Sequence, residues 1–357
     1  MVVASHCDRA LNLLNDIFPY TSFFMPMFMF ISGYFFKDEN VCNIKLYLKK
    51  KFFKLLVYYF VWNLIYGITT WVLYKVGLCS QPKALGVETL FYKPFIDGQQ
   101  YGFSASLWFI PTLFTVEVTF LIIRKLQLKC KYVKIADYIS FIILVGINIF
   151  SVYIAKKGIK NEILIPILKL AFFMAFFQIG KMYKEYWEQK ECNIPTLIVF
   201  GITIIVNIVM IIKYKNINFP SLYNMKDFTY VTPFVPVIVA ITGIWFWLRI
   251  SKILEKSLGE NKCINRISDH TKDIMAHHIF LIYLVNLVLY FLRDSIGLNG
   301  FNAEKFIAAN GWYRYYPGII QFELIYIFIG IYGSLKIADI EKMVLKKIKC
   351  WSKNGKS

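Results

Sequence analysis

The stretch that decides the fold is Met1–Phe36, MVVASHCDRALNLLNDIFPYTSFFMPMFMFISGYFF, which ends in a long run rich in aromatic residues and methionine. Between Tyr20 and Phe36 this run contains no charged side chain. About 17 helical residues are the shortest apolar segment that crosses the hydrocarbon core of a bilayer. The run therefore predicts a membrane-spanning helix.

A proline and two small residues shape this predicted span. Pro26 interrupts the backbone hydrogen-bond ladder and favours a kink. Ser32 and Gly33 present a small surface on which another helix can approach closely. His6 lies upstream, at the border of the same apolar environment. We therefore expect a kinked helix that packs tightly against a neighbour.

The composition also indicates a membrane protein. Hydrophobic residues make up 57% and aromatic residues 18% of the 357 residues, and the mean hydropathy is +0.51. A soluble chain of this composition would expose large aggregation-prone apolar patches. The apolar runs are continuous rather than alternating with polar residues, which favours helices over the strands of a barrel. We predict an all-α, polytopic integral membrane protein.

Nine apolar runs have the length of a single crossing, and a short first span around His6 brings the prediction to about ten transmembrane helices. The runs are 20–36, 55–74, 107–123, 138–155, 163–180, 194–212, 230–248, 274–292 and 318–335. The transmembrane domain is expected at residues 1–336, and a basic cytoplasmic tail at 337–357. Only five residues precede His6, so the first predicted span is short.

Lysine and arginine concentrate in alternate connecting segments. Of the 41 basic residues, 27 lie in the segments 37–54, 124–137, 181–193, 249–273 and 336–357. Such an excess marks cytoplasmic loops. We therefore predict a multi-pass membrane protein with both termini in the cytoplasm.

Two kinds of partner are not expected. The formal net charge of +19 could suggest nucleic acid, but the lysines lie between apolar runs and no nucleic-acid motif is present. Orientation in the bilayer accounts for this charge. The seven cysteines are scattered without a CxxC pair, so neither a metal site nor a disulfide framework is expected.

Four stretches resemble the membrane acyltransferase-3 family, whose members O-acylate sugars of bacterial envelope polysaccharides. They are 2–6 (VVASH), 25–36 (MPMFMFISGYFF), 106–114 (SLWFIPTLF) and 271–278 (TKDIMAHH). They are similar to the family's apolar run ending in histidine, its Pro-x-Phe-x-x-x-Ser-Gly-Tyr signature, its Leu-Trp-Phe-Leu-Pro helix start and its Thr-x-x-Ile-Tyr-x-x-His segment. Within the family, the fucose-4-O-acetylase-like branch is the one suspected.

The resemblance implies an O-acyltransferase. It would transfer an acyl group, expected to be acetyl from acetyl-CoA, to a hydroxyl of an envelope or capsular polysaccharide or of its lipid-linked precursor. Two other interpretations remain open. A glycolipid transporter or flippase would also have many spans and scattered intramembrane charge. The short first span would also fit an inactive, truncated acyltransferase.

Ionisable side chains inside membrane spans are costly and are therefore candidates for function. His6 is the expected general base, because neutral imidazole can take the proton of an attacking hydroxyl. Glu117 is expected either to orient an imidazole or to pair with a cation, and a structural hydrogen bond within the helix bundle is the alternative. His278 matches the family histidine. His277 points about 100° away on the same helix and is expected near the lipid headgroups. Lys169 is the one lysine inside a run.

Three residues are expected to contact the acceptor. Trp108 offers an aromatic face to a sugar ring, although an interfacial tryptophan would fit its position equally well. Tyr34 ends the Ser-Gly-Tyr signature. Asn63 lies within the next span, where an interhelical hydrogen bond is the alternative role.

A lysine cluster is the expected donor site. Lys50, Lys51 and Lys54 follow directly after the Ser-Gly-Tyr helix, and their charges suit the phosphates of acetyl-CoA. A positive-inside anchor would account for the same cluster without any ligand.

Overall fold

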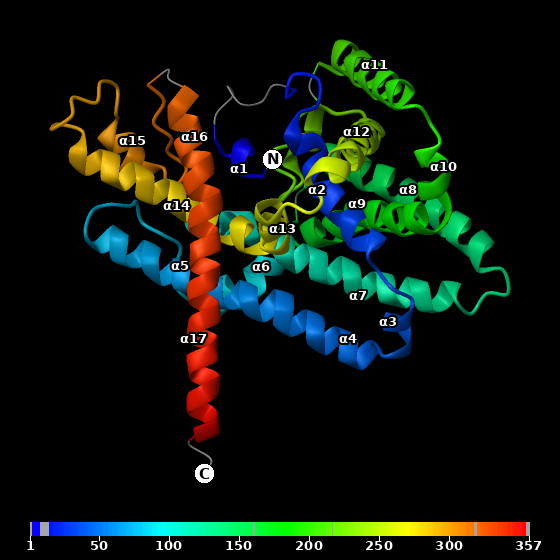
Figure 1. Ribbon diagram of the computed structural model, residues 1–357, viewed down its shortest axis with the longest axis horizontal. Helices are drawn as coiled ribbons and strands as arrows, with labels where there is room; N and C mark the ends of the chain where they lie inside the picture. The colour runs from blue at the N-terminus through cyan, green and yellow to red at the C-terminus, as the bar shows by residue number, and fades with distance from the viewer. Residues whose placement is uncertain (1, 8–13, 160, 216, 318–319, 355–357) are drawn as a thin grey trace.

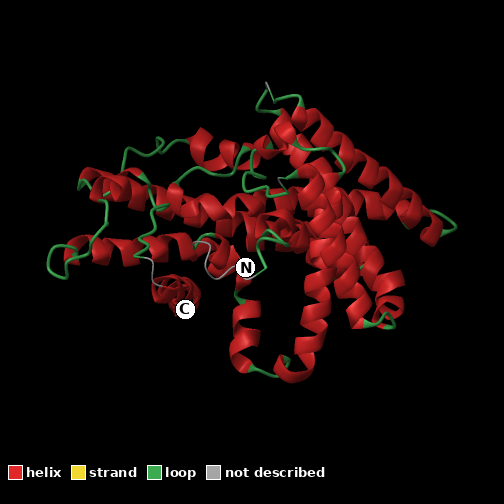
Figure 2. Ribbon diagram, turned by 90° about the horizontal axis from the view of Figure 1, so that it is seen from above, coloured by secondary structure: helices red, strands yellow, loops and turns green. Residues whose placement is uncertain are grey.

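The computed structural model describes residues 2–7, 14–159, 161–215, 217–317 and 320–354. Within these ranges every regular element is a helix, and the connections are loops and turns (Figure 2). The all-α class predicted from the continuous apolar runs is therefore confirmed.

The long helices carry the predicted apolar runs. They are α2 (Tyr20–Tyr34), α5 (Tyr58–Lys75), α7 (Phe109–Gln127), α8 (Val133–Lys156), α9 (Leu164–Met182), α11 (Thr196–Tyr214), α12 (Val235–Leu258), α14 (Thr271–Leu292), α16 (Ile320–Phe328) and α17 (Ser334–Asn354). Shorter helices connect them: α1 (Val2–Ser5), α3 (Glu39–Cys42), α4 (Ile44–Lys51), α6 (Lys93–Ile96), α10 (Glu188–Cys192), α13 (Lys262–Asp269) and α15 (Ala303–Ala308).

Seven helical segments of the described chain are long and apolar enough to cross a membrane, which confirms a polytopic protein. They carry the seven predicted runs between residues 55 and 292. The first predicted run forms α2, which has 15 residues and contains Pro26. Part of the last one forms α16, a π-helical turn and the start of α17. The count of ten crossings stays a prediction.

The segment 37–54 was predicted as a loop, and the structure corrects this in part. Helix α4 continues through a π-helical segment, Phe52–Val57, into α5, so Ile44–Lys75 is helical throughout. Lysine and leucine are good helix formers, and the lysine charges can extend into water from one helix face. The lysine cluster therefore lies on a helical extension of a membrane span.

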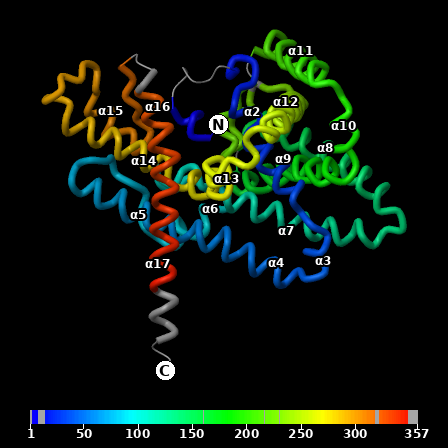
Figure 3. Tube along the Cα trace, viewed as in Figure 1, coloured from blue at the N-terminus to red at the C-terminus, as the bar shows by residue number. Residues whose placement is uncertain are grey.

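The helices form two groups. Helices α2, α8, α9, α11 and α12 pack side by side in one group, and α5, α14, α16 and α17 belong to the other (Figure 1). The short helix α1 contacts both α2 and α14, and so lies between the groups. Helix α17 follows α16 and packs against α14 (Figure 3). The N-terminal motif is thus positioned by both helix groups.

Close contact between α2 and α9 depends on glycine. A Cβ atom added to Gly33 would clash with the backbone carbonyl of Phe177, and one added to Gly180 would clash with the carbonyl of Phe30. The two backbones therefore approach at small residues from both helices. This confirms the close approach predicted at Ser32 and Gly33, and it adds Gly180 as the partner that the sequence did not indicate.

Gly33→Ala is expected to destabilise the protein by about 1–3 kcal/mol, because the added methyl group forces the two backbones apart. The measurement is the melting temperature of the purified protein in detergent. Gly146→Ala is the matched control, because a Cβ atom at Gly146 meets no atom within 4 Å. Equal melting temperatures of the two variants would contradict the tight contact between α2 and α9.

Polar pairs sort the helix ends into two sets. Ion pairs join all five segments that were predicted to be cytoplasmic: Arg124–Asp38 (2.8 Å), Lys181–Asp38 (3.0 Å), Lys252–Glu191 (3.0 Å) and Arg266–Asp339 (2.6 Å). On the other set of ends, Lys93 pairs with Glu162 at 2.9 Å, and the Ser80 N–H donates to Asn310 at 2.9 Å. A chain that crosses a bilayer back and forth must place its consecutive connecting segments on opposite sides, and the two separate sets of pairs have this arrangement.

Candidate active site

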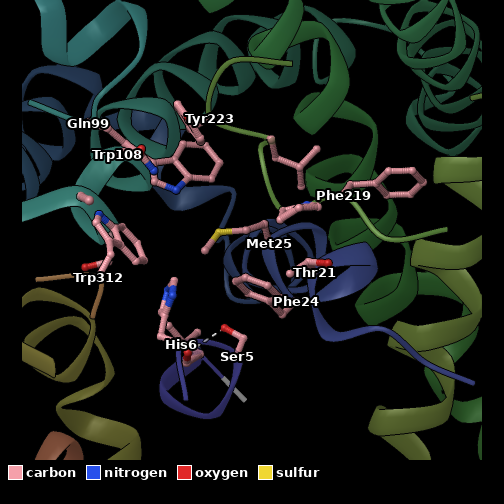
Figure 4. A pocket seen from close by; sticks show the side chains of 15 residues that line it. Ser5, His6, Thr21, Phe24, Met25, Gln99, Trp108, Phe219, Tyr223 and Trp312 are labelled. Atoms are coloured by element: carbon pink, nitrogen blue, oxygen red, sulfur yellow. Dashed lines mark hydrogen bonds between the residues drawn. The ribbon is translucent and has the colours of Figure 1, made fainter. Parts of the chain in front are cut away.

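His6 lies at the wall of a cavity of about 360 Å³, which we call the His6 pocket (Figure 4). Helix α1 ends one residue before His6 and brings the imidazole between the two helix groups. Across the cavity from His6 lie Trp108, Gln99 and Tyr223. The lining therefore combines aromatic faces with amide, hydroxyl and imidazole groups.

The structure brings the two predicted catalytic histidines together. The rings of His6 and His278 stack with centroids 5.1 Å apart, and the rings of His6 and Trp312 meet edge to face with centroids 5.3 Å apart. The Nδ1 atom of His278 lies 2.8 Å from the carbonyl of Ile274, which fixes a proton on Nδ1 as the donor. Nε2 of His278 is then an acceptor, and it is buried without a protein partner in the described part of the chain.

Arg314 holds the backbone at His6 and was not identified from the sequence. Its Nε donates to the carbonyl of His6 at 2.8 Å, and its Nη1 donates to the carbonyls of Gly311 and Tyr313, both at 2.7 Å. The same loop carries Trp312. The only sequence signal was one arginine within an aromatic stretch, WYRYY, of a connecting segment.

Trp108 is held by a 3₁₀ helix, Gly102–Trp108, that packs against α14. Ser106 donates a hydrogen bond to the carbonyl of Met275 at 2.5 Å and ties this helix to α14. Behind Trp108 lies Lys169, whose Nζ is 5.6 Å from the ring centroid. Within the described residues this amine has no hydrogen-bond partner. A cation–π contact thus accompanies the one lysine inside a predicted run.

A second cavity lies at the other end of α2. This lysine pocket has a volume of about 610 Å³, and its lining includes Lys50, Lys51, Lys54 and Glu117. Lys51 and Glu117 form an ion pair at 2.5 Å. The three lysines could hold an anionic ligand, because ammonium groups act as point charges for phosphates.

Glu117 is therefore placed away from both histidines. Thr21 of α2 lines the His6 pocket and Ser32 of the same helix lines the lysine pocket, about 16 Å apart along a helix. Of the two roles expected for Glu117, the structure has the pairing with a cation. The expectation that it orients a catalytic imidazole is corrected, because its depth in the span could not be read from sequence.

One family model, described as an acyltransferase domain, matches residues 1–335. The chain belongs to the acyltransferase 3 family. Among curated proteins and among solved structures, no relative matches it. The family match confirms the resemblance carried by the four motifs and identifies the protein as a membrane acyltransferase. The fucose-4-O-acetylase-like branch stays a prediction.

Two predicted acceptor contacts of this acyltransferase lie outside both cavities. The Tyr34 hydroxyl donates to Glu188 at 2.8 Å and accepts from Lys184 at 2.9 Å, at the end of the molecule that carries the basic segments. Asn63 is fully buried and accepts a hydrogen bond from Ser104 at 3.0 Å. The interhelical bond, which was the alternative for Asn63, is what the structure has.

His277 was expected to be an interfacial residue near the headgroups, but the structure encloses it in protein. Its side chain is fully buried, because α5 and α17 cover that face of α14. The Tyr66 hydroxyl lies 2.7 Å from Nδ1, the Tyr58 hydroxyl lies 3.4 Å from Nε2, and Glu341 lies 3.5 Å from Nε2. His277 and His278 do face different surroundings, as their helical spacing predicts.

Proposed function

We propose that this acyltransferase transfers an acetyl group from acetyl-CoA to a hydroxyl of an envelope or capsular polysaccharide, or of its lipid-linked precursor. The observation that carries the proposal is an imidazole, His6, at the wall of a polar and aromatic cavity. The cavity volume of about 360 Å³ lies in the range of small-ligand sites. Indole faces beside hydrogen-bonding groups suit a sugar ring.

His6 is the proposed general base. As the acceptor oxygen attacks the thioester carbonyl, the imidazole takes the hydroxyl proton. The new C–O bond forms, the C–S bond breaks, and the proton passes to the thiolate that leaves. Arg314 and the neighbouring rings keep the imidazole in one orientation. His278 does not line the pocket itself, and its buried ring stacks on that of His6 and supports it from behind.

The lysine pocket is the proposed donor site, where acetyl-CoA would supply the acyl group as an activated thioester. Lys50, Lys51 and Lys54 would hold its phosphates. The pocket fits this anion because Lys50 and Lys54 line it without an ion pair in the described part of the chain, while Lys51 pairs with Glu117. The proposal requires the acyl end of the donor to reach His6 past the buried face of α2.

The proposed location is a bacterial-type plasma membrane, with the lysine pocket and both termini in the cytoplasm. The basic segments at one set of helix ends support this orientation. The His6 pocket shares its lining with the opposite set of connecting segments, through Gln99, Tyr223 and Trp312. Acceptor sugars would therefore approach from the outer side.

A membrane-impermeant thiol reagent on intact cells is expected to spare Cys42, because this exposed cysteine lies in the predicted cytoplasmic segment 37–54. Cys79 lies in the connecting segment after α5, but it is buried against Tyr283 and is therefore a poor probe of the outer side. The side chain of Cys350 lies outside the described residues.

The matched probe is Ser295→Cys, an exposed position in an outer connecting segment, in a variant that retains Cys42. Labelling of this new cysteine but not of Cys42 agrees with the proposed orientation. The reverse labelling pattern inverts the topology and rejects a cytoplasmic donor site.

Mass spectrometry of envelope glycans from cells with and without the gene tests the reaction itself. Loss of acetyl increments on deletion, restored by the wild-type chain, is the expected result. A transporter would instead change how much glycolipid crosses the membrane while leaving the acetylation of each glycan unchanged. Identical glycans in both strains would reject the proposed acetylation.

A further inference from the structure

A third cavity, distinct from the lysine pocket, adjoins the His6 pocket on the side of the outer connecting segments. This outer hollow has a volume of about 420 Å³. Its walls come from the segment before the 3₁₀ helix, the connection between α8 and α9, and the loop between α11 and α12. Gln99 and Tyr223 line both cavities. The two cavities therefore meet at these two side chains.

One tight turn positions the shared wall. Gly98 has φ +72°, a conformation that favours glycine, and a Cβ atom there would clash with Trp108. Asp97 accepts hydrogen bonds from the Gln99 N–H at 3.3 Å and from the Gln100 side chain at 2.6 Å. The turn thus places Gly98 directly against Trp108 and holds the backbone of Gln99 beside it. The geometry of the two cavities relative to each other is set by the fold.

The charges that line the outer hollow include both signs. Lys83 pairs with Asp97 at 3.8 Å, and Glu162 pairs with Lys93 at 2.9 Å. Lys226 adds a further ammonium group to the wall. Ammonium groups donate hydrogen bonds and carboxylates accept them, so the wall can bind a sugar hydroxyl either as an acceptor or as a donor. The lining holds two ammonium groups, Lys83 and Lys226, and two carboxylates, Asp97 and Glu162, so it has no excess of cations that would favour an anionic ligand.

We propose that the outer hollow binds the sugar units next to the one that is acylated. The acceptor is then a neutral oligosaccharide or polysaccharide segment of more than one unit, rather than a free monosaccharide. One ring lies at His6 and Trp108, the chain passes Gln99 and Tyr223, and the next units contact Glu162 and Lys226. This inference rests on the proposed function and specifies its acceptor.

The test uses the full-length enzyme in detergent with acetyl-CoA. The acceptors are neutral oligosaccharides of increasing length, released from the producing cell's own envelope polysaccharide by partial hydrolysis, and the monosaccharide from complete hydrolysis. Glu162→Gln combined with Lys226→Ala alters the outer hollow alone, because neither residue lines the His6 pocket. Lys305→Ala, an exposed lysine of another outer segment, is the matched control.

We expect KM to fall by about tenfold or more from the monosaccharide to the longer acceptors, as hydrogen bonds to charged groups are added. The double variant should raise KM for the oligosaccharides by about tenfold, with kcat and the KM for the monosaccharide unchanged. Lys226→Ala alone should give an intermediate KM, which guards against misfolding of the double variant.

Acylation of sugars with a KM that is independent of chain length, or a double variant that behaves like Lys305→Ala, would overturn the subsite and leave the proposed function standing. Tighter binding of acidic oligosaccharides than of neutral ones would overturn the assignment to a neutral chain. If no acceptor of any length were acylated, the proposed function would fail, and the subsite with it.

Discussion

Replacing His6 by alanine is expected to lower the rate of acyl transfer by about 10²–10⁴-fold, the usual contribution of a positioned general base. The physical reason is that no other described imidazole reaches the same wall of the cavity. His278 stacks behind His6, and its Nδ1 is committed to the carbonyl of Ile274. The measurement is acetyl transfer from radiolabelled acetyl-CoA to envelope glycan in membranes that contain equal amounts of protein.

The control for this variant is His270→Ala. His270 caps the start of α14 and contacts Asp273 and Lys342, at the set of helix ends that carries the basic segments. Its loss should leave transfer within a few-fold of the parent. Both variants should insert and melt like the parent. Full activity of His6→Ala would reject His6 as the base, whatever the second variant shows.

The fold was predictable because the thickness of the bilayer sets the length of each membrane-spanning apolar run. The runs between residues 55 and 292 all became helices long enough to span, since continuous hydrophobic sequence without charge has few other solutions. The lysines at 49–54 were assigned to a loop for their charge alone. Charge reports which side of the membrane a segment faces, but a helix can continue into water.

The site residues that lie within recognisable sequence motifs could be predicted. The stretches around His6, Trp108 and His278 were recognised. His6 and Trp108 line one cavity, and His278 stacks on His6. Arg314 and Trp312 come from a connecting segment whose position depends on tertiary packing. No local sequence pattern predicts that residues of this segment contact His6.

Depth and rotation within a span explain the remaining corrections. Glu117 and Asn63 were identified as intramembrane polar groups, and both are buried. Their partners, Lys51 and Ser104, are set by which helices pack together and at what height. Sequence periodicity gives one face of a helix but not the neighbour that covers it.

Replacing Lys50, Lys51 and Lys54 together by glutamine is expected to raise the concentration of acetyl-CoA required for half-maximal rate by about tenfold or more, because each lost charge–phosphate contact weakens binding. The deficit should deepen with added salt, since the remaining charge contacts are screened over about 10 Å at 0.1 M ionic strength. Orientation in the membrane should survive, because most of the basic residues of the cytoplasmic segments remain. The measurement is the rate against acetyl-CoA concentration at two salt concentrations.

The matched control replaces Lys125, Lys129 and Lys131 by glutamine. It removes the same charge from another exposed basic segment that does not line the lysine pocket. A change in acetyl-CoA dependence in the first variant alone identifies the lysine pocket as the donor site, because the loss of net charge is equal in both. If only the control variant lost affinity, the donor would bind at the segment 124–137. An unchanged dependence in both correctly oriented variants would leave the Lys50–Lys54 cluster as a topology anchor, with the segment 249–273 as the next place to search.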